Sequence, residues 1–399
     1  MSARVVVAAD FAPETPAAPR PGRALTTRFI DFWLLGGASL LVWLALFVLQ
    51  HFRSAWAVDQ HFKNLTITTV SLALLVNNPH FMVSYQLAYS RGRSFVATHW
   101  WQLVAVPLAL LGLFALAYVD FDRPTAEALP FLPGLARFLS ARGAGTGLWT
   151  TPRFGDFLFS VAFAVMYFTV GWHYTKQTFG CMMLYANFDA YPLSPAQRSL
   201  IKWNLLSVWW VNFTYGNRSQ QQLGFSDFSF YSIDLPDVLA PLAACVLIVG
   251  LALVLYRVVY ANYRATGQLP GANLLVPFVA IYVWWMPLTR QQEFYILLTP
   301  LFHSLQYLAV VSKLENTRLS STPHSELKAT ALVLGMIAAG WLCFELLPNT
   351  IDNRLGTFSA WHMFFFFTAA MLFINIHHYF IDNVVWRFKD PVVRKHLLA

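Results

Sequence analysis

The chain has 399 residues, of which 57% are hydrophobic and only 12% charged, whereas about a quarter of the residues in an average soluble domain are charged. This composition excludes an ordinary soluble protein and indicates an integral membrane protein. The net charge of +8 is not gathered on a basic face with interleaved aromatic residues, so nucleic acid is not an expected partner. Three cysteines without paired spacing predict neither a disulfide framework nor a thiolate metal site.

Ten long apolar runs follow one another along the chain, after an Ala- and Pro-rich N-terminal stretch (1–28) that predicts a flexible cytoplasmic tail. Each run approaches or exceeds the roughly 20 residues that cross a bilayer. The runs cover 29–50, 66–89, 98–119, 155–178, 197–213, 236–258, 270–288, 292–312, 327–347 and 358–384. The sequence therefore predicts an all-α polytopic integral membrane protein with about ten transmembrane helices. These form a single domain at 29–386, followed by a basic cytoplasmic tail at 387–399.

The two longest connections, 120–154 and 214–235, carry Gly, Pro and Ser, which favour turns. A short interfacial helix is expected around 130–140. With the N-terminus inside, the inner segments hold 18 basic residues and the outer ones 9, which together account for all 27. Because basic residues are retained on the cytoplasmic side, both termini are predicted to be cytoplasmic. The predicted location is a bacterial inner membrane.

Histidines lie inside four of the predicted spans, where ionisable side chains are costly and usually serve a function. They are His80, His173, His303 and the adjacent pair His377 and His378. In the predicted topology all four spans run from outside to inside. The histidines of the second, eighth and tenth spans lie 9 to 11 residues before the first basic residue at the inner end. At about 1.5 Å per residue this is nearly one depth.

The depth of His173 is left open, because Lys176 follows it by only three residues and the helix can continue through 177–189, with Lys176 either snorkelling to the interface or pointing into the site. The other predicted imidazoles reach one level, so the four spans favour a joint site. A single histidine in a membrane helix more often packs between helices through a hydrogen bond than binds a metal. It is the coincidence of four spans that favours function here.

An amide side chain lies three or four residues from a histidine in each of these spans, on the same helix face. The pairs are Asn77 with His80, Gln177 with His173, Gln306 with His303, and Asn375 with His378. Such an acceptor can hold the second N–H of a metal-bound imidazole. His378 also has Asp382 four residues on, whereas His377 has only apolar neighbours at these spacings. His378 is therefore the better ligand candidate of the pair.

Neutral imidazoles with few carboxylates suit iron, copper or zinc, and iron, as one or two ions, is the first expectation. The predicted metal ligands are the five histidines, with the four amides in contact with the bound group. Proton donors or acceptors are expected from Tyr85, Lys176, Tyr307 and Asp382.

The predicted function is that of a metal-dependent membrane oxidoreductase, of hydroxylase, desaturase or oxygenase type, acting on a lipid or isoprenoid, with an electron donor as a partner. In kind the histidine set resembles the membrane di-iron desaturases and hydroxylases, whose clustered H-x3–4-H and H-x2–3-H-H spacings this chain lacks. Three alternatives stay open: a b-type haem held by paired imidazoles, a proton-coupled transporter with a histidine relay, and a scaffold protein in which the histidines only pack.

Overall fold

The computed structural model describes residues 23–52, 68, 71–72, 74–144, 146–218, 222–225, 228–285, 293–320, 323–355, 364–386, 390, 395 and 397. Most of the predicted N-terminal tail and much of the C-terminal tail therefore lie outside the described residues. The elements, in chain order, are α1 (Arg28–Phe32), η1 (Trp33–Gly37), α2 (Ala38–Phe52), α4 (Asn77–Tyr89), α5 (Arg93–Thr98), η3 (Trp101–Ala105), α6 (Val106–Val119), α7 (Thr125–Ala128), α8 (Leu132–Ser140), η4 (Gly147–Thr150), α9 (Phe154–Phe188), α10 (Pro195–Gly216), β1 (Gln222–Phe225), β2 (Phe228–Tyr231), α11 (Leu239–Val254), η5 (Leu255–Tyr260), α12 (Ala261–Thr266), α13 (Ala272–Trp285), α14 (Glu293–Leu319), α15 (Ser325–Trp341), η7 (Leu342–Leu346), α16 (Leu347–Leu355) and α17 (Phe365–Val385).

Among the described residues, five helical stretches are long and apolar enough to cross a membrane. They are Arg28–Val48, Trp101–Val119, Phe154–Phe188, Leu239–Thr266 and Ser325–Leu355. They correspond to the first, third, fourth, sixth and ninth predicted spans, and the other five ranges also contain helices. Among these, α13 has only 14 residues, and two histidines, two asparagines and an aspartate reduce the apolar character of α17. The protein is thus helical with five helices that suit a membrane, and ten crossings are not established.

Helix α9 is longer than its predicted span, which ended at 178. It has 35 residues, or roughly 52 Å at 1.5 Å per residue, more than the roughly 30 Å hydrocarbon core of a bilayer. It continues because the first proline after it is Pro192, and prolines commonly follow helix ends. As a result His173 lies near the middle of a helix rather than near its end.

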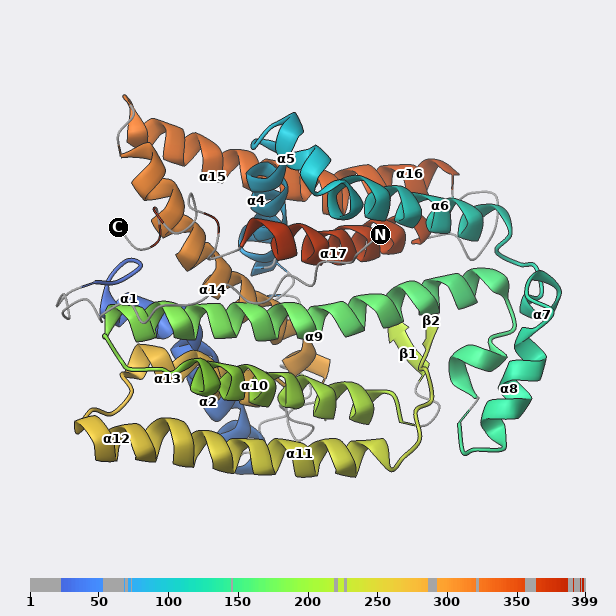
Figure 1. The fold of residues 1–399 in the computed structure, drawn as a ribbon. Helices are drawn as coiled ribbons and strands as arrows, with labels where there is room; N and C mark the ends of the chain where they lie inside the picture. The colour runs from blue at the N-terminus through green and yellow to red at the C-terminus, as the bar shows by residue number, and fades with distance from the viewer. Residues whose placement is uncertain are drawn as a thin grey trace, which may run out of the picture.

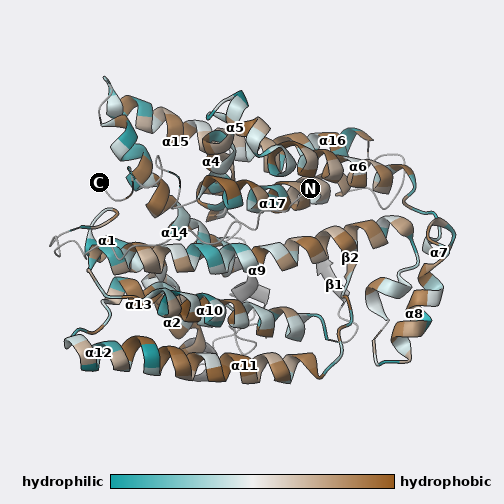
Figure 2. Cartoon of the chain, viewed as in Figure 1, coloured by the Kyte–Doolittle hydropathy of each residue, from teal (hydrophilic) through white to brown (hydrophobic). Residues whose placement is uncertain are grey.

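Several long helices lie roughly along one direction and form a layered bundle (Figure 1). In this view α6, α9, α10, α11 and α17 run from side to side, and α14 crosses them obliquely. The short helices α7 and α8 lie at one end, and α8 coincides with the helix expected around 130–140. Helices α6, α11 and α15 carry mostly hydrophobic residues (Figure 2). The spans of α11 and α15 are only 17% and 11% buried, as expected of apolar helices that face lipid.

The connection 214–235, expected to form turns, contains a hairpin in which β1 pairs antiparallel with β2. The hairpin packs on α9: the backbone N–H of Tyr231 donates to Ser160 Oγ at 3.1 Å, and the ring of buried Phe230 stacks on Phe163 at 4.6 Å. It is an exception to the predicted all-α fold.

Two glycines allow close approach of helices in the bundle. A Cβ on Gly36 would lie 2.7 Å from the Cβ of Ala280 in α13. A Cβ on Gly171 would overlap the indole of Trp209 in α10 at 1.4 Å. These contacts hold η1 and α10 tightly against their neighbours, because atoms cannot pack closer than van der Waals contact.

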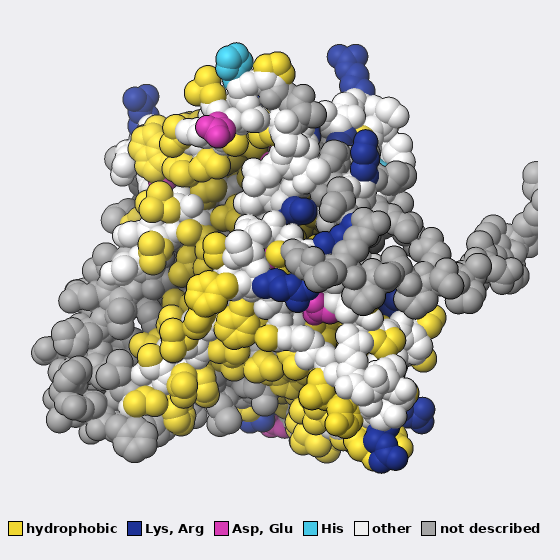
Figure 3. Space-filling model, turned by 90° about the vertical axis from the view of Figure 1, so that its left-hand side faces the viewer, with side chains coloured by type: hydrophobic (Ala, Val, Ile, Leu, Met, Phe, Trp, Pro, Cys, Tyr) yellow, Lys and Arg dark blue, Asp and Glu magenta, His cyan; other side chains and the backbone are white. Residues whose placement is uncertain are grey.

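One end of the bundle carries scattered Lys and Arg side chains among apolar ones (Figure 3). At this end Arg28 pairs with Asp189 at 2.7 Å, which ties the start of α1 to the end of α9. Arg91, just after α4, pairs with Asp390. The same segments were assigned to the inner side by the charge bias of the sequence.

Candidate metal centre

Four imidazoles, one each from α4, α9, α14 and α17, meet inside the bundle. They are His80, His173, His303 and His378, and all are buried. Nε2 of His80 lies 3.2 Å from Nε2 of His378, and Nε2 of His173 lies 2.9 Å from Nε2 of His303. The segments that carry these rings are up to 298 residues apart in the chain. Their meeting is therefore a product of the tertiary fold.

Asp382 joins the four imidazoles from the next turn of α17. Its Oδ2 lies 3.5 Å from Nε2 of His378 and 3.6 Å from Nε2 of His173. Potential ligand atoms fall into two groups that share His378, with all atoms of a group within 4.8 Å: His80, His303 and His378, and His173, His378 and Asp382. We call these four histidines and Asp382 the histidine cluster.

The spacing of the nitrogens suits a metal ion. Metal–nitrogen bonds of about 2.0–2.1 Å place two ligands of a tetrahedral ion roughly 3.3 Å apart. The two Nε2 pairs, at 2.9 and 3.2 Å, differ from this by a few tenths of an ångström. Small side-chain shifts would therefore bring each pair to the spacing of two ligands of one ion.

The position of the ring proton of His80 follows from its partners. Nδ1 lies 2.6 Å from the backbone carbonyl of Asn77, at the first turn of α4. Because a carbonyl oxygen only accepts, the single proton of the neutral ring lies on Nδ1. The lone pair of Nε2 then faces the cluster. Ser304 Oγ also contacts this Nδ1 at 2.9 Å and donates to Asn77 Oδ1 at 2.8 Å.

Among the described residues, the carboxylate of Asp382 accepts a hydrogen bond at one of its two oxygens. Tyr307 donates to Oδ1 at 3.2 Å, and the Tyr307 hydroxyl contacts Ser84 Oγ at 2.5 Å and accepts from Trp386 Nε1 at 3.0 Å. Oδ2, the oxygen on the cluster side, has no hydrogen-bond partner among the described residues. A buried oxygen without a partner is rare, and a cation held by the cluster would supply one.

The ring of His303 is fixed by stacking. Tyr174 of α9 lies face to face with it, at 3.8 Å between ring centroids and 19° between planes. Gln177 Nε2 donates to the backbone carbonyl of His303 at 2.9 Å. These contacts lock α14 onto α9 beside the cluster.

His377 is directed away from the cluster. Its Nδ1 accepts from the Tyr85 hydroxyl at 2.9 Å, and its Nε2 lies 3.2 Å from the backbone carbonyl of Gln102 in η3. Adjacent residues point about 100° apart on a helix, so His377 faces η3 while His378 faces the cluster. Both nitrogens of His377 have partners, and Tyr85 lies with it rather than with the other four histidines.

The four amides have partners other than the imidazole nitrogens. Gln177 donates to Gln306 Oε1 at 3.2 Å as well as to the backbone of α14, and Gln306 donates to a backbone carbonyl of η1. Asn375 donates to a backbone carbonyl one turn earlier, at 2.8 Å, and Asn77 contacts His80 through its backbone. The amides therefore join helices or cap their own turn.

Lys176 does not point into the cluster. Its side chain is exposed, its ammonium donates to Asn383 Oδ1, and it lies 5.3 Å from the centre of the Trp172 ring. Of the four predicted proton-transfer residues, the structure places Tyr307 and Asp382 at the cluster.

Sequence reasoning missed several residues that hold the cluster, namely Tyr174, Ser304, Ser84 and Trp386. Ser84 follows His80 by four residues, so helical spacing was a usable signal for it. Ser304 and Tyr174 each directly follow a histidine on the chain but contact a histidine of another helix. Only the packing of the helices brings them into the site.

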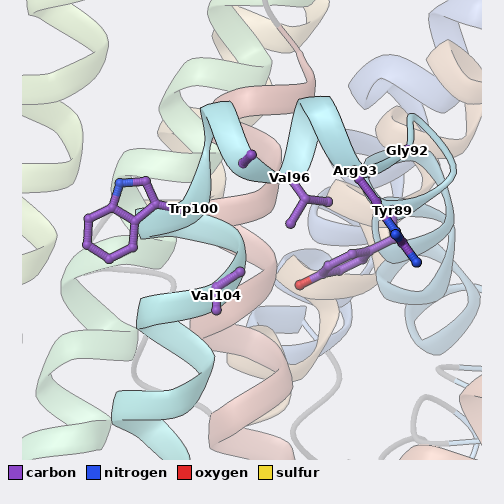
Figure 4. Close-up of a pocket in the computed structure, with 7 residues that line it drawn as sticks. Tyr89, Gly92, Arg93, Val96, Trp100 and Val104 are labelled. Carbon is purple, nitrogen blue, oxygen red and sulfur yellow. The ribbon is translucent and has the colours of Figure 1, made fainter.

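A shallow groove of about 350 Å³ lies apart from the cluster, beyond the last turn of α4. Tyr89, Gly92, Arg93, Val96, Ala97, Trp100 and Val104 line it, and Figure 4 shows these side chains around the turn between α4 and α5. Nine residues separate Tyr89 from His80, or about 13 Å along a helix. The groove contains no member of the histidine cluster.

Comparison of the chain with models of protein families, with curated proteins and with solved structures finds no match. Function is therefore inferred from the geometry of the cluster.

Proposed function

We propose that the histidine cluster binds a transition-metal ion within the membrane, and that the protein is a metal-dependent oxidoreductase acting on a lipid or isoprenoid. The observation that carries this proposal is the convergence of four buried Nε2 atoms and one carboxylate oxygen from four helices. Imidazoles suit iron, copper and zinc, and imidazoles with a carboxylate are typical of non-haem iron. Iron is therefore the proposed ion.

The residues at such a centre would have two kinds of role, as metal ligands and as proton donors or acceptors. His80, His173, His303 and His378 would hold the ion, with Asp382 as a further ligand. A bound iron ion supplies the redox chemistry that hydroxylation, desaturation or oxidative cleavage requires. Tyr307, which donates to Asp382, is placed to hold or pass a proton at its hydroxyl oxygen. The apolar helices around the cluster exclude water and leave lipid as the accessible substrate.

The close nitrogen pairs favour a non-haem ion over a b-type haem. In a bis-histidine haem the porphyrin plane separates the two coordinating nitrogens. Here the nitrogens of each pair lie within hydrogen-bond distance of each other, which leaves no room for a porphyrin between them.

A proton relay is a second candidate, supported by one chain of contacts. Ser84, Tyr307 and Asp382 are joined by hydrogen bonds beside the cluster. Buried ionisable groups in such a chain are typical of proton-coupled transporters. Reconstituted protein would then carry a substrate along a pH gradient, with flux lost in Asp382→Asn.

We further propose that the chain crosses the membrane ten times, with both termini in the cytoplasm of a bacterial cell and an external reductant as its partner. The five apolar helices and helices in the other five ranges support this count. The charge bias of the connecting segments supports the orientation.

The experiment for the oxidoreductase compares three proteins reconstituted in lipid vesicles with reductant and oxygen. Wild type is expected to consume oxygen and to yield oxidised lipid by mass spectrometry. His303→Ala is expected to lose both, whereas His377→Ala, next to the ligand His378 in sequence, is expected to retain them. Equal turnover in wild type and His303→Ala would contradict the proposal.

A further inference from the structure

Two buried indoles at the end of α13 have no hydrogen-bond acceptor among the residues that the structure describes. Trp284 and Trp285 are each 7% exposed, and within the described part of the chain Nε1 of neither has a partner. An indole N–H can only donate, and buried donors are almost always paired. Two adjacent unpaired donors therefore mark a place where a hydrogen-bond acceptor would be stabilised.

Both indoles pack around the tyrosine that stacks on the histidine cluster. The ring of Tyr174 lies 5.6 Å from that of Trp285, 6.4 Å from that of Trp284 and 3.8 Å from that of His303. His303 contributes a third polar atom, since its Nδ1 also has no partner among the described residues. If Nε2 of this ring binds a metal, Nδ1 carries the proton and is a donor.

The surroundings of these donors select the kind of acceptor. Lys176, two residues after Tyr174 in α9, donates to Asn383 and lies over the ring of Trp172. An anion buried here without a countercharge would be costly, so a neutral oxygen is favoured. Three large aromatic rings around the donors favour a flat, conjugated group.

We infer that the layer of Tyr174, Trp284 and Trp285 binds a neutral conjugated carbonyl of an apolar lipid, such as a quinone or an enone, beside His303. The carbonyl oxygen accepts from the indole N–H groups, and the flat group packs on the aromatic rings. This inference rests on the proposed function, because it names the substrate class of the same centre.

The test measures binding of a decyl-substituted 1,4-benzoquinone to purified protein in lipid nanodiscs, with decylbenzene as the probe that lacks carbonyls. Trp284→Phe and Trp285→Phe keep an aromatic ring and remove one N–H each. Loss of one neutral hydrogen bond is expected to weaken quinone binding about three- to tenfold. Trp149→Phe is the matched control, since its indole already donates to the carbonyl of Ile233 at 2.8 Å, and it should not change binding.

Infrared difference spectra of the wild type give a second measurement that needs no variant. Hydrogen bonds from the indoles are expected to lower the carbonyl stretching frequency of the bound quinone. An unshifted carbonyl band, or equal affinity for the quinone and decylbenzene, would overturn the inference. So would equal quinone affinity in the wild type and in folded Trp284→Phe and Trp285→Phe.

Metal analysis of the same samples separates the two proposals. Protein that binds the quinone through its indoles but holds no metal would refute the metal centre and leave the carbonyl site standing. Protein that holds the metal but binds the quinone no better than decylbenzene would refute the carbonyl site alone.

Discussion

At the scale of single residues, the neighbours His377 and His378 have opposite surroundings. His378 faces three other imidazoles, whereas both ring nitrogens of His377 already have partners, the Tyr85 hydroxyl and a backbone carbonyl. The hydrogen-bond partners of a metal-ligating side chain fix its orientation and strengthen metal binding. Two tyrosines, Tyr85 and Tyr307, therefore provide a matched pair of tests.

Tyr307→Phe is expected to weaken metal binding about 10- to 100-fold, because Asp382 loses the hydroxyl that orients its carboxylate. Tyr85→Phe should leave metal affinity unchanged, since its hydroxyl contacts His377 and no member of the cluster. Competition with a chelator of known affinity measures the metal affinity of both variants. A similar loss in the two variants would contradict the assigned roles.

The sequence predicted which types of residue meet at the site and which segments carry them, but not all of their contacts. Helical spacing pointed to His378 over His377 and to Asp382. It also assigned the amides to imidazole nitrogens, whereas the structure has Gln177 and Gln306 bound to each other and to backbone. Spacing within one helix does not reveal contacts between helices, which decided the partners of Ser304 and Tyr174.

At the scale of elements, the cluster depends on how closely the helices approach. Gly36 lets η1 pack against α13, and Gln306 of α14 in turn donates to a carbonyl of η1. The apolar runs predicted where helices occur, because length and composition are local properties. They could not predict the hairpin over α9, because strand pairing is not a local property, whereas the continuation of α9 past 178 was an option that the sequence left open.

Gly36→Ala is expected to destabilise the protein by about 1–3 kcal/mol, because the new Cβ would lie 2.7 Å from Ala280 and 2.9 Å from the carbonyl of Val276. Gly112→Ala, in α6, meets no atom within 4 Å and should be neutral or add up to about 1 kcal/mol by favouring helix. Thermal unfolding in detergent compares the two. Equal unfolding temperatures for Gly36→Ala and Gly112→Ala would argue against the close packing of η1 on α13.

At the scale of the whole molecule, the bundle brings histidines from four helices spread along the chain to one place, and the end of the bundle seen in Figure 3 carries scattered Lys and Arg side chains. The charge distribution predicts that this end is cytoplasmic. A fluorescent protein that matures only in the cytoplasm, fused after Ala399, is therefore expected to fluoresce, and the same fusion within 120–154 is not. The reverse pattern would show that the orientation is inverted.

The metal content of the detergent-purified protein, with its visible spectrum on the same sample, tests the central claim most directly. The histidine cluster predicts about one or two iron, copper or zinc ions per chain without a haem band. The metal should be lost in His80→Ala and His303→Ala and retained in His377→Ala. Wild-type protein without stoichiometric metal after expression in metal-supplemented medium, or metal that survives in His80→Ala and His303→Ala, would contradict the account.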